Sequence, residues 1–524
     1  MSSPPEPESI LDPGGFDGTP IGPALLWLRR QPEESHLVGG SVRDLLLGRP
    51  IGDLDVVVET GGQELARRLA DVMGGAYVGL DTERDIGRAI LRQPAQGLVQ
   101  VDVAAWRADT LVEDLLLRDF TVNAMAVSLA HGPSGIIDPS GGLADTAQRF
   151  LRLVSDTALA DDPLRSLRAI RLVAELSSLG FRLESETARR VQRASPALAT
   201  CADERVRDEL VKILSVDRPG QWVAEMGDYE QLDVLLPELE RTHGVLQSPP
   251  HHLDVFDHSL LVVDMVSWHQ ALIDGCEEPR DEWDLVLMDV LAEQLELVQE
   301  HFSHGEGAGL RSRGHMLRWA ALGHDLGKPT TAAVKASSSG ETRIRFLGHE
   351  RVGADLISDV LRRLRFNDAE VRRVASVVAH HLRPLQLASA SGPPSRKAVH
   401  RYFRDLGDAG IDVAMLSLAD FRAKRDSGAT LDDWLSLLGV VEGLLDDFWQ
   451  RPEQVVSPPA LVDGRDLMET LNLPPGPLIG QLLEKIAEQQ AVGTIQTGRQ
   501  ALDYALRQQE EHGITGLPPV GAGG

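Results

Sequence analysis

Short apolar runs of β-rich character occur between residues 20 and 150 and predict β-strands in this part of the chain. They lie at Asp55–Glu59, Ala89–Leu91 and Leu98–Ala104. Between them, Gln63–Met73 has apolar positions at helical spacing, and the Gly74–Gly75 pair that follows is typical of a helix end. This mixture of strands and helices predicts an α/β domain.

Beyond about residue 155 the strand pattern fades and long amphipathic stretches follow, such as Pro163–Leu179 and Ala188–Ala199. Their apolar spacing predicts helices, and the remainder of the chain has the same character. Breaks rich in Gly, Pro and Ser fall at 245–250, 335–342, 389–396 and 457–459. The predicted fold class is therefore α+β, with a mixed α/β N-terminal head followed by mostly α-helical parts.

The chain has 524 residues, enough for three or four domains at roughly 150 residues each. It contains no apolar run near the roughly 18–20 residues that span a membrane. The N-terminus lacks the basic and apolar regions of a signal peptide. Only two cysteines, Cys201 and Cys276, are present, which argues against a disulfide framework. We therefore expect a cytoplasmic protein without a membrane partner.

The charge balance is acidic, with 79 Asp and Glu against 52 Lys and Arg and a net charge of −27. This works against an RNA partner, because Lys and Arg drive phosphate binding. The charge is uneven, however: residues 147–218 are rich in arginine, whereas residues 274–300 carry a dense acidic run. A basic face for a nucleic acid is therefore compatible with the composition. For the acidic segment 274–310 the sequence indicates only a solvated surface.

The residues at 37–43 predict a phosphate-binding turn. Leu37 and Val38 are expected to end a strand, and the Gly39–Gly40 pair lets the backbone approach a phosphate because no Cβ intervenes. Ser41 then begins a helix whose N-terminal N–H groups favour an anion. Arg43, one turn into that helix, is placed to pair with a phosphate oxygen.

Two carboxylates, Asp53 and Asp55, open the next apolar run. Residues i and i+2 of a strand point to the same face, so the two negative charges repel unless a cation lies between them. Mg²⁺ ions satisfy this arrangement and also organise phosphoryl transfer. Asp102, within an alternating run, is a candidate third carboxylate from a neighbouring strand. Each feature alone is compatible with an ordinary turn or a solvated strand end, and the ordered combination favours a nucleotide site.

Four motifs in this order resemble the class II tRNA nucleotidyltransferase and poly(A) polymerase family. The first is the Gly-Gly, Val, Arg, Asp opening at 39–44 followed by Asp53 and Asp55. The others are Arg118–Ala124 (RDFTVNA), Asp161–Arg168 (DDPLRSLR), and Glu204–Val206 with Glu209–Leu210. The resemblance is strong over residues 35–245, and the segment 463–483 is similar to the tail of members that carry an HD domain.

The resemblance implies a role for each matched position. Asp53 and Asp55 would bind Mg²⁺ and activate the RNA 3′-hydroxyl, with Asp102 as the third catalytic candidate. The predicted nucleotide-binding residues are Gly39, Gly40, Arg43, Arg118, Asn123, Asp162, Arg165, Arg168 and Arg171. Within this set, Asp162 and Arg165 would read the Watson–Crick edge of the incoming base, since aspartate accepts and arginine offers a rigid donor fork. An ordinary ion-paired helix is the alternative for these helical residues.

This sequence departs from the family pattern at three places. Leu117 precedes Arg118 where the family has a second arginine, and Asp161 stands where glutamate is usual. Only residues 108–117 separate Arg107 from Arg118, whereas CCA-adding members have a longer stretch with a flexible loop. The short link is similar to that of CC-adding members. We therefore predict transfer of CMP from CTP to a tRNA 3′ end, with a separate enzyme adding A.

Three alternatives stay open at this point. The first is full CCA addition, which uses ATP as well as CTP. The second is a poly(A) polymerase, against which the histidine-rich second half and the acidic tail both count. The third is a metal-dependent phosphohydrolase whose front domain only binds RNA.

The second half contains histidines and aspartates in the order found in the HD phosphohydrolase superfamily, which it resembles. Histidine and carboxylate are suitable ligands for a divalent transition metal. The core ligands implied are His258, His324, Asp325 and Asp420, while His349 and His381 are candidates for a second metal or a phosphate. Lys328 suits a phosphate contact. A second, phosphohydrolase activity is one prediction, and a helical scaffold for RNA is the alternative.

These expectations together divide the chain into six parts. They are a disordered leader at 1–19, a nucleotidyltransferase head at 20–155, a helical neck at 156–245, an HD-like helical domain at 246–445, a helical tail at 446–515 and a disordered end at 516–524.

Overall fold

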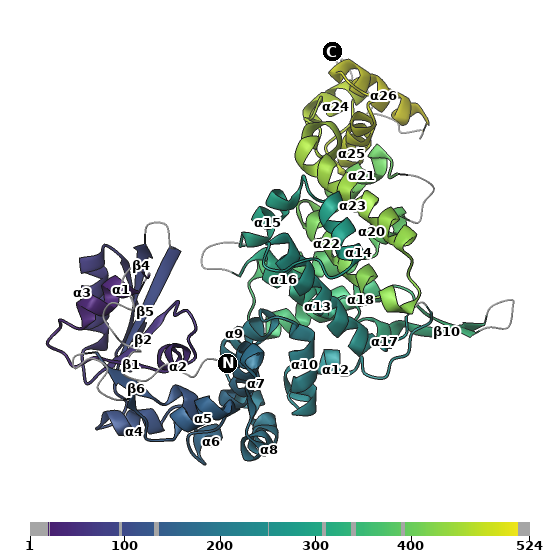
Figure 1. Cartoon of the computed structure of the whole chain (residues 1–524). Coiled ribbons are helices and arrows are strands. Elements are labelled where there is room, and N and C mark those ends of the chain that lie inside the picture. The colour runs from purple at the N-terminus through teal and green to yellow at the C-terminus, as the bar shows by residue number, and fades with distance from the viewer. Residues whose placement is uncertain are drawn as a thin grey trace. The chain divides into compact units, whose positions relative to one another are not determined.

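The computed structural model describes residues 19, 21–93, 97–129, 136–249, 251–305, 311–336, 342–388 and 393–511. Apart from Thr19, the predicted leader at 1–19 lies outside the described residues, and so does the predicted end at 516–524. The chain forms two compact units (Figure 1): residues 1–209 with 225–235, and residues 210–224 with 236–524. The finer division into head, neck, HD-like domain and tail stays a prediction.

A seven-stranded sheet forms the centre of the head, in the order β3-β4-β5-β2-β1-β6-β7. All neighbouring strands are antiparallel except β2 and β5, which run parallel. The strands are β1 His36–Val38, β2 Leu54–Val58, β3 Ala76–Asp81, β4 Ile86–Gln93, β5 Gly97–Ala105, β6 Ala126–Ser128 and β7 Ile136–Ile137. The predicted strand runs thus correspond to β2, β4 and β5.

Helix α3, Gly62–Met73, covers the sheet with Leu65 and Leu69, which are fully buried against the strand residues of the main core. It ends at Gly74, whose φ of 65° is the left-handed conformation that the sequence predicted for a helix end. The predicted helix and its stop are therefore confirmed, and the mixed α/β character of the head with them.

The remaining elements of the first unit are helical apart from one short parallel pair, β8 Phe150–Leu151 with β9 Arg182–Leu183. The helices are α1 Gly22–Leu28, α2 Gly40–Leu46, α4 Leu111–Leu116, α5 Gly142–Gln148, α6 Ala158–Asp161, α7 Leu164–Leu176, α8 Ser185–Ala194, α9 Asp203–Leu214, α10 Pro219–Asp228 and α11 Leu232–Leu235, of which α9 and α10 cross the unit boundary. The predicted stretch Pro163–Leu179 is α7 with a short 3₁₀ turn.

The second unit is built from helices, as predicted, with one hairpin that the sequence did not predict, β10 Ala332–Ala336 with β11 Thr342–Phe346. The helices are α12 Pro237–Glu240, α13 Val255–Ile273, α14 Glu282–Val290, α15 Leu295–Ser303, α16 Arg313–Gly323, α17 Lys328–Thr331, α18 His349–Arg363, α19 Asp368–His380, α20 Arg383–Ala388, α21 Arg396–Leu406, α22 Ala409–Arg422, α23 Leu431–Gln450, α24 Gly464–Leu471, α25 Pro477–Val492 and α26 Gly498–Glu511. Among the described helices, none is long and apolar enough to cross a membrane.

The acidic segment has a packing role in addition to its solvated surface. Asp281 caps the start of α14 and pairs with Arg422 at 2.6 Å and with Arg425. Asp284 is fully buried and accepts from the Trp268 indole at 3.0 Å. These carboxylates hold the segment against the end of α22.

Candidate functional site

The turn after β1 has the conformation that a glycine pair permits. Gly39 has a φ of 66°, and a Cβ at this position would lie 3.2 Å from both Arg118 Nη1 and Asp55 Oδ2. A side chain would therefore be strained by the backbone and crowded by two polar groups. The Ser41 hydroxyl donates to the Asp53 carbonyl at 3.2 Å and accepts from the Asp55 amide at 2.9 Å, which fastens the start of α2 to β2.

Two of the three predicted carboxylates lie on neighbouring strands of the sheet, and Asp53 directly precedes one of these strands. Asp55 on β2 is the direct register partner of Asp102 on the parallel strand β5, so both side chains stand on one face. Asp53 accepts from the Gln100 amide at 3.2 Å. Burial raises the pKa of Asp55, and Asp102 and Asp53 raise it further against the opposing charge of Arg118. A cation at this place would remove that mutual repulsion.

Asp102 already has a cation partner within the protein. Arg88 on β4 donates two hydrogen bonds to it, at 2.6 and 2.7 Å, in the bidentate geometry that suits a carboxylate. Among the described residues, the head carboxylates are not among the groups whose ligand atoms all lie within 4.8 Å of one another. The head therefore presents an open array of acids and no closed metal cage.

A buried chain of hydrogen bonds connects the glycine turn to the motif at 118–124. Arg43 Nη1 donates to the Asn123 side-chain oxygen at 2.9 Å, and Asn123 donates to Asp119 at 3.2 Å. Asp119 in turn pairs with Arg168 of α7 at 2.6 Å. Although burial alone would raise the pKa of Asp119, Arg168 and these hydrogen bonds hold it below its ordinary value. Three of the predicted nucleotide-binding residues, Arg43, Asn123 and Arg168, thus lie in one connected region through Asp119.

Arg118 lies between the carboxylates and the segment that precedes it. Its Nη2 lies 3.4 Å from Asp114 Oδ2, and its Nη1 would lie 3.2 Å from a Cβ at Gly39. Burial lowers the pKa of Arg118, while Asp114 opposes this effect. The guanidinium therefore faces the turn at which a phosphate is predicted.

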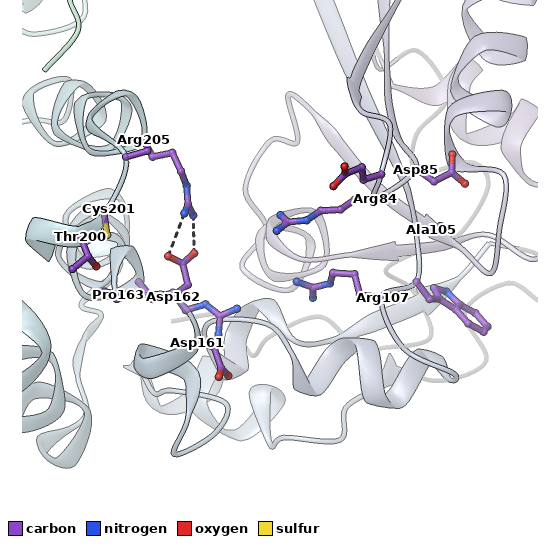
Figure 2. A pocket seen from close by; sticks show the side chains of 14 residues that line it. Arg84, Asp85, Ala105, Arg107, Asp161, Asp162, Pro163, Thr200, Cys201 and Arg205 are labelled. Carbon is purple, nitrogen blue, oxygen red and sulfur yellow. Dashed lines mark hydrogen bonds and ion pairs between the residues drawn. The ribbon is translucent and has the colours of Figure 1, made fainter. Parts of the chain in front are cut away.

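The two predicted base-reading residues line a cavity of about 690 Å³ (Figure 2). Asp162, at the end of α6, accepts two hydrogen bonds from Arg205 of α9, at 2.6 and 3.4 Å. Arg165 donates to the carbonyls of Leu117, Arg118 and Ala158 at 2.7, 3.2 and 3.2 Å. In Figure 2, Arg84 and Arg107 point from the sheet side towards the Asp162–Arg205 pair. The cavity thus has arginines on both walls.

Arg171 differs from the other predicted nucleotide-binding residues. It is buried and pairs with Glu209 at 2.5 Å and with Glu175 at 2.7 Å. Burial would lower the pKa of Arg171, but the two carboxylates raise it above its ordinary value. This geometry is that of an ion pair between α7 and α9, and nucleotide binding by Arg171 stays a prediction.

The histidines and aspartates of the second unit come together from five elements. Two overlapping groups each keep their ligand atoms within 4.8 Å: His258 with His324 and Asp325, and Asp325 with His349 and His381. All five residues are buried. Asp420 of α22 joins the first group through its contact with His258 Nε2 at 3.0 Å. All six predicted HD-like ligands therefore belong to one centre.

The ring orientations leave metal-binding lone pairs directed inward. The Nδ1 atoms of His324, His349 and His381 each face a backbone carbonyl three residues earlier, at 2.7, 2.7 and 2.8 Å. In a neutral ring the proton then lies on Nδ1, which is the usual arrangement in metal-ligating histidines. The free Nε2 atoms of His324 and His349 point at Asp325, at 3.1 and 3.3 Å, and have no hydrogen-bond partner.

A lone pair facing a carboxylate in a buried place is unfavourable unless a cation lies between them. Asp325 Oδ1 also has no hydrogen-bond donor, whereas Oδ2 has Lys328 Nζ at 2.6 Å as its ionic partner. Lys424 pairs with Asp420 at 2.8 Å. The donor set therefore fits a divalent metal, which Lys328 and Lys424 would only partly replace. Gly327 allows this packing, since a Cβ there would lie 2.1 Å from the His349 carbonyl oxygen.

Several residues of these sites were not predicted to be functional. Ser41, Arg88 and Arg205 contact the predicted carboxylates directly, and Asp114 contacts Arg118. Arg205 lies within the fourth motif, so its motif position was a usable signal. Arg88 and Asp114 lie outside the four motifs, so no motif position pointed to them. Arg88 meets Asp102 through the pairing of β4 with β5, and Asp114 meets Arg118 through the fold of α4.

Comparison with known proteins is consistent with this geometry. Residues 35–152 match the poly A polymerase head domain, residues 180–242 match the probable RNA and SrmB-binding site of polymerase A, and residues 255–420 match the HD domain. The A-adding tRNA nucleotidyltransferase of Deinococcus radiodurans is 34% identical over 92% of this chain and 96% of its own length. The CC-adding tRNA nucleotidyltransferase of Thermus thermophilus is 32% identical over 91% of this chain and 94% of its own.

Among solved structures, a CCA-adding enzyme in its apo form has a similar fold. The TM-score is 0.56 at 20% sequence identity, and the match covers 94% of both chains. At this level of identity the match supports the fold alone.

Proposed function

We propose that this chain, which belongs to the class II tRNA nucleotidyltransferase and poly(A) polymerase family, transfers CMP from CTP to the 3′ end of tRNA without a nucleic-acid template. The observation that carries the proposal is the arrangement in the first unit, where Asp55 and Asp102 stand side by side and Arg118 faces the Gly39–Gly40 turn. The reader pair Asp162 and Arg165 lines a cavity within the same unit.

The reaction joins the tRNA 3′-oxygen to the α-phosphorus of CTP and breaks the bond to the β-phosphate, releasing pyrophosphate. Mg²⁺ held by Asp53 and Asp55 would supply Lewis-acid activation of the hydroxyl and neutralise phosphate charge. Asp102, held by Arg88, contributes further negative charge beside Asp55. Arg118 and Arg43 lie around the glycine turn and are the cations that would bind the triphosphate.

Base selection is assigned to Asp162 and Arg165. A guanidinium has five N–H donors, and three hydrogen bonds from Arg165 go to backbone carbonyls. Two donors are therefore left for a base. Cytosine offers two acceptors, N3 and O2, beside one donor, the N4 amino group that Asp162 would accept. Adenine offers only N1 and its N6 amino group on the same edge. This count favours cytosine.

CC addition is also favoured by the link between Arg107 and Arg118, which is short and folds as helix α4. A separate enzyme would then add the terminal A. Full CCA addition stays the first alternative, and A addition is a second because of the similarity to the A-adding relative. In the second unit we propose a divalent transition metal at the HD-like centre, on the strength of its inward-facing lone pairs.

The test uses transcripts of one tRNA ending before CCA, after C and after CC, each incubated with Mg²⁺ and either CTP or ATP. We expect two cytidines to be added from CTP and no efficient addition of A to the CC end. Efficient A addition after CC would instead establish a CCA-adding enzyme. Addition of A to the CC end without any C addition would establish an A-adding enzyme, and both results contradict the proposal.

A further inference from the structure

The short link between Arg107 and Arg118 is a folded element. Helix α4 spans Leu111–Leu116, and the Thr110 side chain caps its start by accepting from the Glu113 amide at 3.2 Å. Within it, Leu111 and Leu115 are buried on the side of the sheet that carries Val38 and Val57. The link is therefore anchored at its start and along one face.

Asp114, in the last turn of α4, is bound by both arginines that flank the link. It is buried, with 1% of its surface exposed. Its Oδ1 accepts from the Arg107 amide at 3.1 Å and from Arg107 Nε at 3.0 Å, while its Oδ2 lies 3.4 Å from Arg118 Nη2. Arg107 Nη2 also donates to the Asp114 carbonyl at 3.2 Å. The Asp114 carboxylate thus connects the residues at the two ends of the link, Arg107 and Arg118.

The same link holds the base-reading arginine. The carbonyls of Leu117 and Arg118, directly after α4, accept from Arg165 Nη2 at 2.7 Å and Nη1 at 3.2 Å. A planar guanidinium with bonds to these two carbonyls and to Ala158 has a fixed orientation, so its remaining donors also point in a fixed direction. The position of residues 117–118 therefore sets how Arg165 faces a base.

We propose that Asp114 is a positioning residue for base selection: by binding Arg107 and Arg118 it keeps the end of α4 in place, and so keeps Arg165 in the orientation that selects cytosine over adenine. This inference rests on the proposed nucleotidyl transfer and deepens it. Asp114 contacts no base itself. Its effect passes through the backbone of residues 117–118.

Charge also favours the contacts of Asp114 with Arg107 and Arg118, which we call the Asp114 clasp. Burial alone would raise the pKa of Asp114, yet Arg118 and the bonds from Arg107 hold it below its ordinary value. The carboxylate is therefore ionised at neutral pH and keeps both charged partners. A neutral amide at this position would keep the shape but lose charge-assisted hydrogen bonds, which are about twice as strong as neutral ones.

The test compares wild type with Asp114→Asn and, as a matched control, Asp109→Asn. Asp109 lies on the same link but is exposed. The readout is kcat/KM for CTP divided by kcat/KM for ATP, measured on one tRNA end, with thermal melting as a folding check. We expect this ratio to fall about tenfold or more in Asp114→Asn, a size typical of one lost selectivity contact, and to stay unchanged in Asp109→Asn.

An unchanged ratio, including equal losses with both nucleotides, would overturn the proposal, because a merely structural residue lowers both rates alike. Arg107→Gln is the second variant, since it removes one partner of Asp114 and leaves Arg118 in place. It should lower the ratio less but in the same direction, and an unchanged ratio there would also contradict the clasp. If wild type prefers ATP, the assignment of CMP transfer fails, while a loss of the native preference in Asp114→Asn still supports the clasp.

Discussion

The carboxylates of the head and the histidine–aspartate centre of the second unit both gather groups that bind cations, but they do so in different ways. Asp53 directly precedes β2 and is exposed, Asp55 is the second residue of that strand, and Asp102 is already paired with Arg88. The HD-like ligands are buried, and three of the four histidine rings are oriented by backbone carbonyls. We infer that substrate and its ions complete the head site, whereas an ion alone would complete the second.

This comparison predicts its largest effect in the head. Asp55→Asn and Asp53→Asn should each lower the rate of CMP transfer by about a thousandfold or more, because several kcal/mol of charge stabilisation at the phosphate would be lost. Thermal stability should fall little, because Asp55→Asn removes both the burial of a charge and the repulsion that together raise the pKa of Asp55. Single-turnover transfer with CTP measures the effect.

Glu59→Gln is the control for these variants, since Glu59 is exposed at the other end of β2. It should transfer CMP at the wild-type rate. Full activity in Asp55→Asn would contradict the assignment of the head carboxylates to the chemistry.

An intermediate effect is expected in the second unit. Asp325→Asn should abolish stoichiometric binding of a divalent transition metal, which elemental analysis of the purified protein measures. Because a ligand at a thousand times its dissociation constant contributes about 4 kcal/mol to stability, melting of this unit should fall by several degrees. Removal of the metal from wild type with a chelator should have the same effect.

CMP transfer in Asp325→Asn should stay within about threefold of wild type. The matched control is Asp355→Asn, a surface exchange that should leave both metal content and transfer intact. Asp355 is exposed on α18. Wild-type metal content in Asp325→Asn would show that this aspartate is not a ligand.

The sequence predicted local features of both sites better than the contacts between distant residues. The strand runs and the Gly39–Gly40 turn were readable because they depend on neighbouring residues. The pairing of Asp55 with Asp102 depends on β2 and β5 lying in parallel, and no local pattern determines which strands meet. Arg205 is 43 residues from Asp162, so only its motif position pointed to it.

Arg171 shows that the sequence also does not reveal which distant residue a predicted site residue contacts. The family resemblance predicted nucleotide binding for Arg171 together with Arg165 and Arg168, but helical spacing alone does not reveal which side of α7 is covered. In the fold Arg171 lies against Glu209 of α9, 38 residues later in the chain. The tertiary partner decides whether a helical arginine is an ion-pair residue or a free cation.

The smallest expected effect separates the metal centre from an ordinary buried acid on the same helix. Asp264 lies on α13, which also carries His258, and accepts from the Gly220 amide at 2.7 Å. Burial raises the pKa of Asp264 to about 6. Its folded pKa therefore exceeds the unfolded value of 3.8, so its contribution to stability is full below about pH 4 and is lost as pH rises through about 6.

Asp264→Asn should consequently stabilise the protein at pH 7.5 by about 1 kcal/mol, a value reduced because the side chain is only partly buried. It should also remove part of the pH dependence of melting between pH 4 and 6, since asparagine stays neutral and still accepts from Gly220. Chelator-treated protein should show the same gain, because no metal is involved. A gain confined to metal-loaded protein would instead place Asp264 in the HD-like centre and weaken the separation between that centre and the surrounding helix.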